Sequence, residues 1–176
     1  TAFAPTFPVL NDRLLKAIAG PDGELTQTMR VSRSVQPQGV ARRLGTGTDP
    51  VVLHHRVFFV GDDRVSLANT YFPEPLAAGT EIEQPRDAGL TAFETLEASG
   101  LPADDLQWDL AARTATAAEC REMRWPTALP VFVQICTAYT GGDRPIGCWV
   151  VVLPGDRVLF TERCHRKARP NIHAVM

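Results

Sequence analysis

Two long pairs of β-forming runs, each joined by a short turn, constrain the fold of this chain more than any other feature. The first pair is Val51–Val60 and Arg64–Phe72, with Gly-Asp-Asp between the runs. The second pair is Val131–Thr140 and Pro145–Leu153, joined by Gly-Gly-Asp-Arg. β-Branched and aromatic residues favour strands, and short turns rich in Gly and Asp join antiparallel neighbours. The sequence therefore predicts two β-hairpins.

The rest of the chain alternates between shorter strand-like runs and short helices. Further strands are predicted over Leu25–Val35, Leu106–Ala115 and Arg157–Glu162. Apolar spacing with start and stop signals predicts short helices over Asn11–Ile18, Pro37–Leu44, Thr91–Gly100 and Thr116–Arg124. The last two helices begin with capping boxes, in which a Thr hydroxyl and a Glu carboxylate satisfy exposed backbone N–H groups. The pattern predicts an α+β fold with a mainly antiparallel sheet of five to six strands.

The composition excludes several classes of protein. No apolar run approaches the roughly 20 residues that a membrane-spanning helix needs, and the N-terminus lacks a secretion signal, so a cytoplasmic location is expected. The formal net charge of −2 gives no basic field that could neutralise phosphates, so this chain alone is not expected to bind nucleic acid. The basic cluster from Arg163 to Arg169 is interpreted as a solvated tail.

Chemical motifs indicate neither catalysis nor a metal or cofactor. No glycine-rich nucleotide loop and no nucleophile elbow occurs in the sequence. His54 and His55 are neighbours on a predicted strand, where successive side chains point to opposite faces, so they cannot form a metal clamp. The four cysteines are widely spaced and are interpreted as reduced: Cys120, Cys136, Cys148 and Cys164. Whether Cys136 and Cys148, on strands predicted to pair, form a disulfide stays open.

Seven short phrases, taken in their order and spacing, resemble one known family. They are Val40–Gly45, Val51–Arg56, Leu67–Pro73, Phe93–Glu97, Ala115–Glu119, Thr137–Ile146 and Leu153–Arg157. Together they look like the UTRA domain, the effector-binding module of GntR-type transcription regulators of the histidine-utilisation-repressor (HutC) branch. The resemblance covers roughly residues 28 to 163. It implies a chorismate-lyase-like fold, a homodimer, and a pocket over the sheet for a small-molecule effector.

The resemblance also divides the chain and implies its partners. Residues 1–24 are expected to be a leader or linker remnant with a short helix, residues 25–163 a UTRA-like ligand-binding domain, and residues 164–176 a basic C-terminal tail. DNA is expected as a partner only through an N-terminal winged-helix domain, which this chain lacks. No membrane partner is expected. Whether the chain is a fragment of a longer regulator or a stand-alone relative stays open.

Position by position, the resemblance implies a pocket that has exchanged sugar-phosphate contacts for apolar ones. Arg56 matches the first of two arginines that sugar-phosphate binders of the family place on this strand, and Phe58 stands at the second. Glutamates of the family are replaced at Ala68 and Gly147, a phosphate-binding Ser is matched by Thr91, and a Tyr is replaced by Phe93. The expected ligand-binding set is Arg56, Phe58, Ala68, Thr70, Thr91, Phe93, Gly147 and Trp149. Such a site favours a ligand with one anionic or polar end and an apolar body.

Three functions are therefore weighed from the sequence. The first is a sensor whose ligand shifts its conformational population without reacting. The second is an enzyme, because the fold family includes chorismate lyase, although Phe58, Ala68 and Gly147 make the arginine and glutamate set of that lyase hard to assemble. The third is a ligand-free dimerisation module, in which Arg56 is a surface or dimer-contact residue and large side chains such as Phe58 and Trp149 fill the core.

Overall fold

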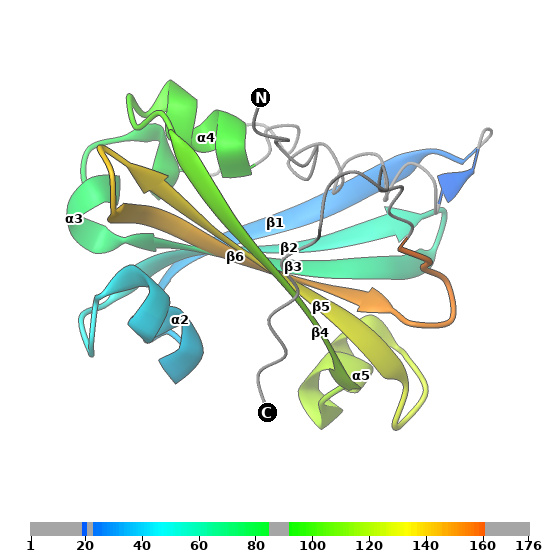
Figure 1. The fold of residues 1–176 in the computed structure, drawn as a ribbon. Helices are drawn as coiled ribbons and strands as arrows, with labels where there is room; N and C mark the ends of the chain where they lie inside the picture. The colour runs from blue at the N-terminus through cyan, green and yellow to red at the C-terminus, as the bar shows by residue number, and fades with distance from the viewer. Residues whose placement is uncertain (1–18, 21–22, 85–91, 161–176) are drawn as a thin grey trace, which may run out of the picture.

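The computed structural model describes residues 19–20, 23–84 and 92–160, and these residues form one antiparallel sheet of six strands (Figure 1). The strands are β1 (Leu25–Ser34), β2 (Val51–Val60), β3 (Asp63–Pro73), β4 (Asp105–Thr114), β5 (Pro130–Thr140) and β6 (Arg144–Pro154). Their order across the sheet is β1-β2-β3-β6-β5-β4. The two predicted hairpins are β2–β3 and β5–β6, and β3 pairs with β6 in the middle of the sheet. The predicted α+β fold and strand number are confirmed.

Glycines allow the tight turns of both hairpins. Gly61 has a φ of 57° and Gly142 a φ of 93°, in the left-handed region that residues with a side chain rarely adopt. The first hairpin also shifts register between Phe58 and Phe59, next to its turn. A shift of this kind bends and twists the strand locally. Phe58 is therefore the last residue of β2 before the regular alternation of side chains is interrupted.

Five short helical segments connect the strands: α2 (Gln38–Leu44), α3 (Glu74–Ala77), the 3₁₀ turn η2 (Glu81–Glu83), α4 (Ala92–Ala98) and α5 (Ala117–Met123). The predicted capping box of α5 is confirmed, because the Glu119 N–H donates to the Thr116 hydroxyl (3.2 Å) and the Thr116 N–H donates to the Glu119 carboxylate (2.7 Å). The predicted helix over Asn11–Ile18 and the capping residue Thr91 lie outside the described residues. None of the helices in the described ranges is long and apolar enough to cross a membrane.

The predicted strand over Arg157–Glu162 is wrong for the part that is described, since residues 157–160 contain no strand. β6 already has β3 on one side and β5 on the other, so a chain that turns back from β6 finds no free strand edge there. Instead, the Gly155 N–H donates to the Pro130 carbonyl (2.8 Å). The Phe160 ring then packs edge-on against Phe132, with ring centroids 5.1 Å apart.

The two faces of the sheet carry different covers. The segments α3, η2 and α4 lie over one face, here called the α4 face, whose core includes Phe72, Ile82 and Leu96 (Figure 1). The helices α2 and α5 lie over the other, here called the α2 face, with smaller core clusters around Leu44 and Met123. Because side chains alternate along a strand, the even-numbered residues of β2 face α4 and the odd-numbered ones face α2.

One exposed arginine ties the cover of the α4 face to an edge strand. Arg33, near the end of β1, forms ion pairs with Glu74 of α3 and with Glu83 of η2, the latter at 2.7 Å. Its side chain is 62% exposed, so these pairs lie in solvent. The segments α3 and η2 are thus held to β1 by the same guanidinium.

The question of a disulfide between β5 and β6 is settled by register. Cys136 is opposite Trp149, whereas Cys148 is opposite Thr137, one position further along. Residues one position apart point to opposite faces of a sheet, so the two thiols lie on different sides and are free. Burial raises the pKa of both thiols, that of Cys148 to about 11.

Candidate functional site

The α4 face holds a buried arginine that no carboxylate of the described residues pairs with. Arg56 lies in the middle of β2, opposite Met29 on β1 and Ala68 on β3, and is only 6% exposed. Its Nε donates to the Met29 sulfur at 3.3 Å, and sulfur is a weak acceptor. Burial lowers the pKa of Arg56, while the negative charge of Glu94 on α4 acts in the opposite direction. The one hydrogen bond of this guanidinium to the described residues is therefore a weak one.

A second polar group, the ring of His54, lies two residues before Arg56 on the same face. Its Nε2 is 2.6 Å from the Ile82 carbonyl oxygen of η2. A carbonyl can only accept, so Nε2 carries the proton and Nδ1 of the neutral ring is an acceptor. This Nδ1 is buried and has no hydrogen-bond partner. Burial lowers the pKa of His54, as does the positive charge of Arg56, so the ring is neutral at pH 7.

The sequence-predicted ligand residues converge on this same face. Arg56 is opposite Ala68, and Thr70 is opposite both His54 and Trp149, so these side chains form two adjacent rows across the central strands. Trp149 is 6% exposed and packs edge-on against Trp108, with ring centroids 6.0 Å apart. The face therefore combines a cation, a hydroxyl and aromatic surface within neighbouring strands.

The remaining predicted residues that the structure describes lie on β2, β6 and α4. Phe58 is the next residue of β2 on this face and packs, half-buried, against the core. Gly147 lies beneath Phe72 and Leu96, where an added Cβ would be 3.4 Å from the Phe72 ring. Phe93 is half-buried on α4, and Thr91 lies outside the described residues.

Sequence reasoning missed His54 and Gln134 as members of this face. Gln134 on β5 is 2% exposed, and its amide oxygen is buried without a partner. It lies in the same row as Arg56, separated from it by Ala68 and Val151. The alternation of side chains that places Arg56 on the α4 face also places His54 there, so this signal was present in the sequence. The position of Gln134 depends on strand order, which the sequence does not reveal.

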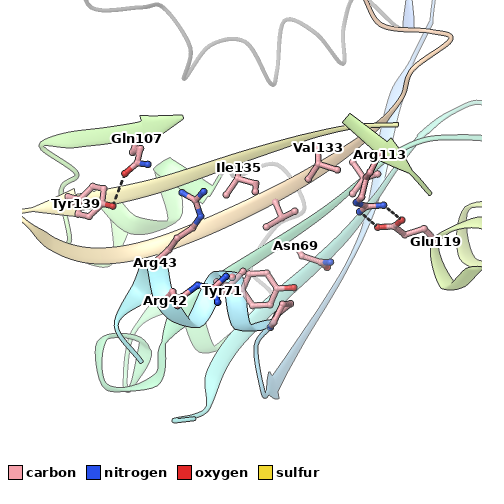
Figure 2. A pocket seen from close by; sticks show the side chains of 15 residues that line it. Arg42, Arg43, Asn69, Tyr71, Gln107, Arg113, Glu119, Val133, Ile135 and Tyr139 are labelled. Carbon is pink, nitrogen blue, oxygen red and sulfur yellow. Dashed lines mark hydrogen bonds and ion pairs between the residues drawn. The ribbon is translucent and has the colours of Figure 1, made fainter. Parts of the chain in front are cut away.

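The α2 face contains a groove of about 730 Å³, which is lined by residues of α2, α5 and the strands β3, β6, β5 and β4 (Figure 2). Its floor is apolar and is made by Val133, Ile135, Val150 and Val152. The charged groups at its rim are largely paired with one another: Arg43 lies 2.6 Å from Asp109, and Arg113 lies 2.7 Å from Glu119. None of the sequence-predicted ligand residues lines this groove. Sequence reasoning did not predict it, because it depends on how α2 and α5 lie against the sheet.

His55 confirms that adjacent residues of β2 serve different faces. Its Nε2 is 2.7 Å from the Glu122 carboxylate on α5, and its Nδ1 is 2.7 Å from the Asn69 side-chain oxygen. These contacts attach α5 to the sheet on the side away from His54. In the described ranges, no group of three or more His, Cys, Asp or Glu residues is arranged to hold a metal ion.

A single antiparallel sheet with buried polar groups beneath short helices defines an α+β class of domain. The chain belongs to the UTRA domain family, whose model matches residues 25–158. This confirms the resemblance inferred from the sequence phrases.

Solved structures agree with that assignment. The effector domain of PhnF from Mycobacterium smegmatis superposes with a TM-score of 0.70 at 19% identity, covering 86% of this chain and 94% of that one. The C-terminal domain of a histidine utilization repressor from Pseudomonas syringae pv. tomato gives 0.67 at 18% identity, covering 81% of this chain and 100% of that one. At such identities the likeness establishes the fold.

The chain corresponds to part of a longer regulator in one further match. A solved structure assigned to the GntR family of transcriptional regulators gives a TM-score of 0.69 at 21% identity. That match covers 79% of this chain but 58% of the regulator. No curated protein matches the chain in sequence.

Proposed function

We propose that this chain is the effector-sensing and dimerisation domain of a GntR-type transcription regulator, and that its effector is a small metabolite with an anionic end and an apolar body. The observation that carries the proposal is Arg56, a buried cation without a carboxylate partner among the described residues. Burying an unpaired charge is costly, so an anion that reaches Arg56 gains a strong, charge-assisted contact. The aromatic side chains of Trp149 and Phe58 suit the apolar body.

The contacts of Arg56 and His54 suggest how binding would be communicated. Arg56 touches Met29 on the edge strand β1, and His54 holds the backbone of η2. A ligand that draws the guanidinium toward itself changes the first contact and favours the conformations in which η2 closes over it. In the whole regulator, a winged-helix domain on the N-terminal side of β1 would respond to that shift and change its binding to DNA in the cytoplasm.

We infer that the ligand is bound and not converted. No ion pair joins Arg56 to a carboxylate of the described residues. The neighbouring titratable group, His54, is engaged through Nε2 with a backbone carbonyl. Incubation with chorismate, with detection of 4-hydroxybenzoate by chromatography, tests this directly. Turnover above the uncatalysed rate would contradict the sensor assignment.

We infer a homodimer formed through the groove of the α2 face. Ile135 and Val150 in its floor are apolar and only half-buried, and the face is opposite to Arg56, so a second copy would leave the effector site accessible. Sedimentation analysis should show a dimer that Ile135→Glu converts to monomer. The control Val35→Glu, at a position 75% exposed and outside the groove, should remain dimeric. A dimer unaffected by Ile135→Glu would place the interface elsewhere.

Thermal-shift measurements with carboxylates of increasing hydrophobicity, from acetate to phenylacetate, test the effector site. A ligand at 100 times its Kd stabilises the folded state by about 2.7 kcal/mol, which is readily detected. We expect stabilisation that grows with apolar content and is lost in Arg56→Met. The matched control is Arg144→Met, an exposed arginine at the start of β6 that lies outside the groove. Absence of stabilisation by every acid, or equal stabilisation of Arg56→Met, would count against the proposal.

A further inference from the structure

The unpartnered Nδ1 of His54 is the observation on which this inference is built. His54 is 2% exposed, and the Ile82 carbonyl fixes its tautomer, so a lone pair points into the protein with nothing to donate to it. Leaving a buried acceptor unsatisfied costs on the order of 1–3 kcal/mol. His54 lies two residues before Arg56 on the same face of β2, and it is opposite Thr70 on β3.

We infer that His54 Nδ1 accepts a hydrogen bond from the effector, which therefore carries an O–H or N–H donor in addition to its anionic group. This inference rests on the proposed function and restricts the effector to acids that also carry a hydrogen-bond donor. Simple fatty or aryl acids would fill the site but leave Nδ1 unsatisfied. Hydroxylated or amide-bearing acids would satisfy both Arg56 and His54.

We expect the donor group of the effector to be neutral, because the protein atoms that can accept its hydrogen bond are neutral. The imidazole Nδ1 of His54 and the amide oxygen of Gln134 carry no charge, and the adjacent charged group is the cation Arg56. An ammonium group would lie buried near the like charge of Arg56, which already interacts with the negative charge of Glu94. The site thus selects a hydroxyl or amide donor against an amine.

The spacing of the two groups indicates where the donor lies on the ligand. Residues two apart on a strand have Cα atoms roughly 6.6–6.8 Å apart and point to the same side. A planar acid with its donor at the opposite end of one ring spans a similar distance. The aromatic ring of such an acid would lie beside Trp149, the neighbour of Thr70 in the row that contains His54.

Calorimetry with matched pairs of acids tests the inference. The probes are 4-hydroxyphenylacetate with 4-methoxyphenylacetate, and 4-hydroxybenzoate with 4-methoxybenzoate, because methylation removes the donor and keeps the ring and the carboxylate. 4-(Aminomethyl)benzoate supplies the amine. We expect the wild-type chain to bind the better hydroxy acid about tenfold more tightly than its methyl ether, and the amine more weakly than either.

Two variants of His54 separate its two nitrogens. In His54→Gln the amide can still donate to the Ile82 carbonyl, but no acceptor remains at the position of Nδ1, so the preference for the hydroxy acid should vanish. In His54→Asn an oxygen lies near the former Nδ1, so part of the preference should remain. The control His55→Gln alters the adjacent histidine on the opposite face and should leave the preference unchanged. A preference that persists in His54→Gln would overturn the inference.

A measurement on the wild-type chain decides the matter even if the variants fold poorly. The ¹⁵N resonance of His54 Nδ1 should move upfield when the hydroxy acid is added and stay in place with its methyl ether. A resonance unmoved by the bound hydroxy acid would overturn the inference. If acids bind through Arg56 without any donor preference, this inference fails and the proposed function stands. If no acid of any kind binds, the proposed function fails as well.

Discussion

The two faces of the sheet differ in how they treat polar groups. On the α2 face, Arg43 and Arg113 each meet a carboxylate at the rim of an open groove. On the α4 face, the hydrogen bond of buried Arg56 is to the Met29 sulfur, a weak acceptor, and the buried Nδ1 of His54 has no hydrogen-bond partner. The groove and the unsatisfied chemistry therefore lie on opposite sides. The effector site that we propose is therefore identified by its buried polar atoms, on the face opposite to the groove.

The largest expected effect concerns the core beneath each face. Phe72→Ala removes a fully buried ring from the α4 face and should lower the free energy of unfolding by about 3–5 kcal/mol. Ile135→Ala, in the half-buried floor of the groove, should cost only about 1–2 kcal/mol, because less surface is lost from the core. Urea unfolding of both variants measures the difference. Equal losses would show that the groove floor is as well packed as the α4 face.

The two kinds of arginine should respond with opposite signs. Without ligand, Arg56→Met removes a buried charge that lacks a carboxylate partner and should raise the free energy of unfolding by about 1–3 kcal/mol. Arg113→Met removes the partner of Glu119 at a more exposed site and should lower it by less than about 1 kcal/mol. Urea unfolding at low ligand concentration compares them. Destabilisation by Arg56→Met would mean that the described contacts already satisfy the guanidinium.

The faces should also lose stability in different pH ranges. Burial lowers the pKa of His54 below 6.5, so the unfolded chain takes up this proton first and the fold loses stability as the pH drops below about 6.5. The slope is at most about 1.4 kcal/mol per pH unit and should be absent in His54→Gln. On the α2 face, burial acts to raise the pKa of Glu119, but bonds from Arg113 and Thr116 outweigh it and lower the pKa below 4.5. The contribution of Glu119 is therefore lost only in more acidic solution. Identical pH profiles of the free energy of unfolding for wild type and His54→Gln would contradict the role of His54 in this pH range.

The smallest effect is expected at the start of α5, which covers the α2 face. Thr116→Ala removes the acceptor for the Glu119 N–H and should cost about 1 kcal/mol. Thr26→Ala, at an exposed position of β1, provides the control and should change stability by less than about half as much. Thermal unfolding followed by circular dichroism measures both. A loss that also weakened acid binding would show that the two faces are coupled.

The sequence predicted most of the local structure because its signals are local. Turn glycines, alternation along β2 and the Thr116 capping box each act within a few residues, and each was found in the structure. The strand predicted after Pro154 failed because its formation depends on a free sheet edge, which is a property of strand order. Strand order follows from contacts between residues far apart in the chain, which a single sequence does not display.

The candidate site was predictable to a similar extent. Alternation alone brings Arg56 and Phe58 to one face, and the family resemblance added Ala68. The structure places these residues, together with the expected residues Thr70 and Trp149, on that same face. The unpartnered nitrogen of His54 could not be predicted, because it results from the single carbonyl of Ile82 taking the other nitrogen. The role of all these residues toward a ligand remains a prediction.

The double ion pair of Arg33 has a consequence for the solution in which the domain works. Pairs that lie in solvent weaken as ionic strength rises, since the Debye length falls from about 10 Å at 0.1 M salt to about 3 Å at 1 M. The guanidinium is shared by α3 and η2, so screening it loosens both segments together. Added salt should therefore hasten hydrogen exchange of the η2 amides before the central strands respond. The ionic composition of the medium thus becomes an independent control on access to the α4 face.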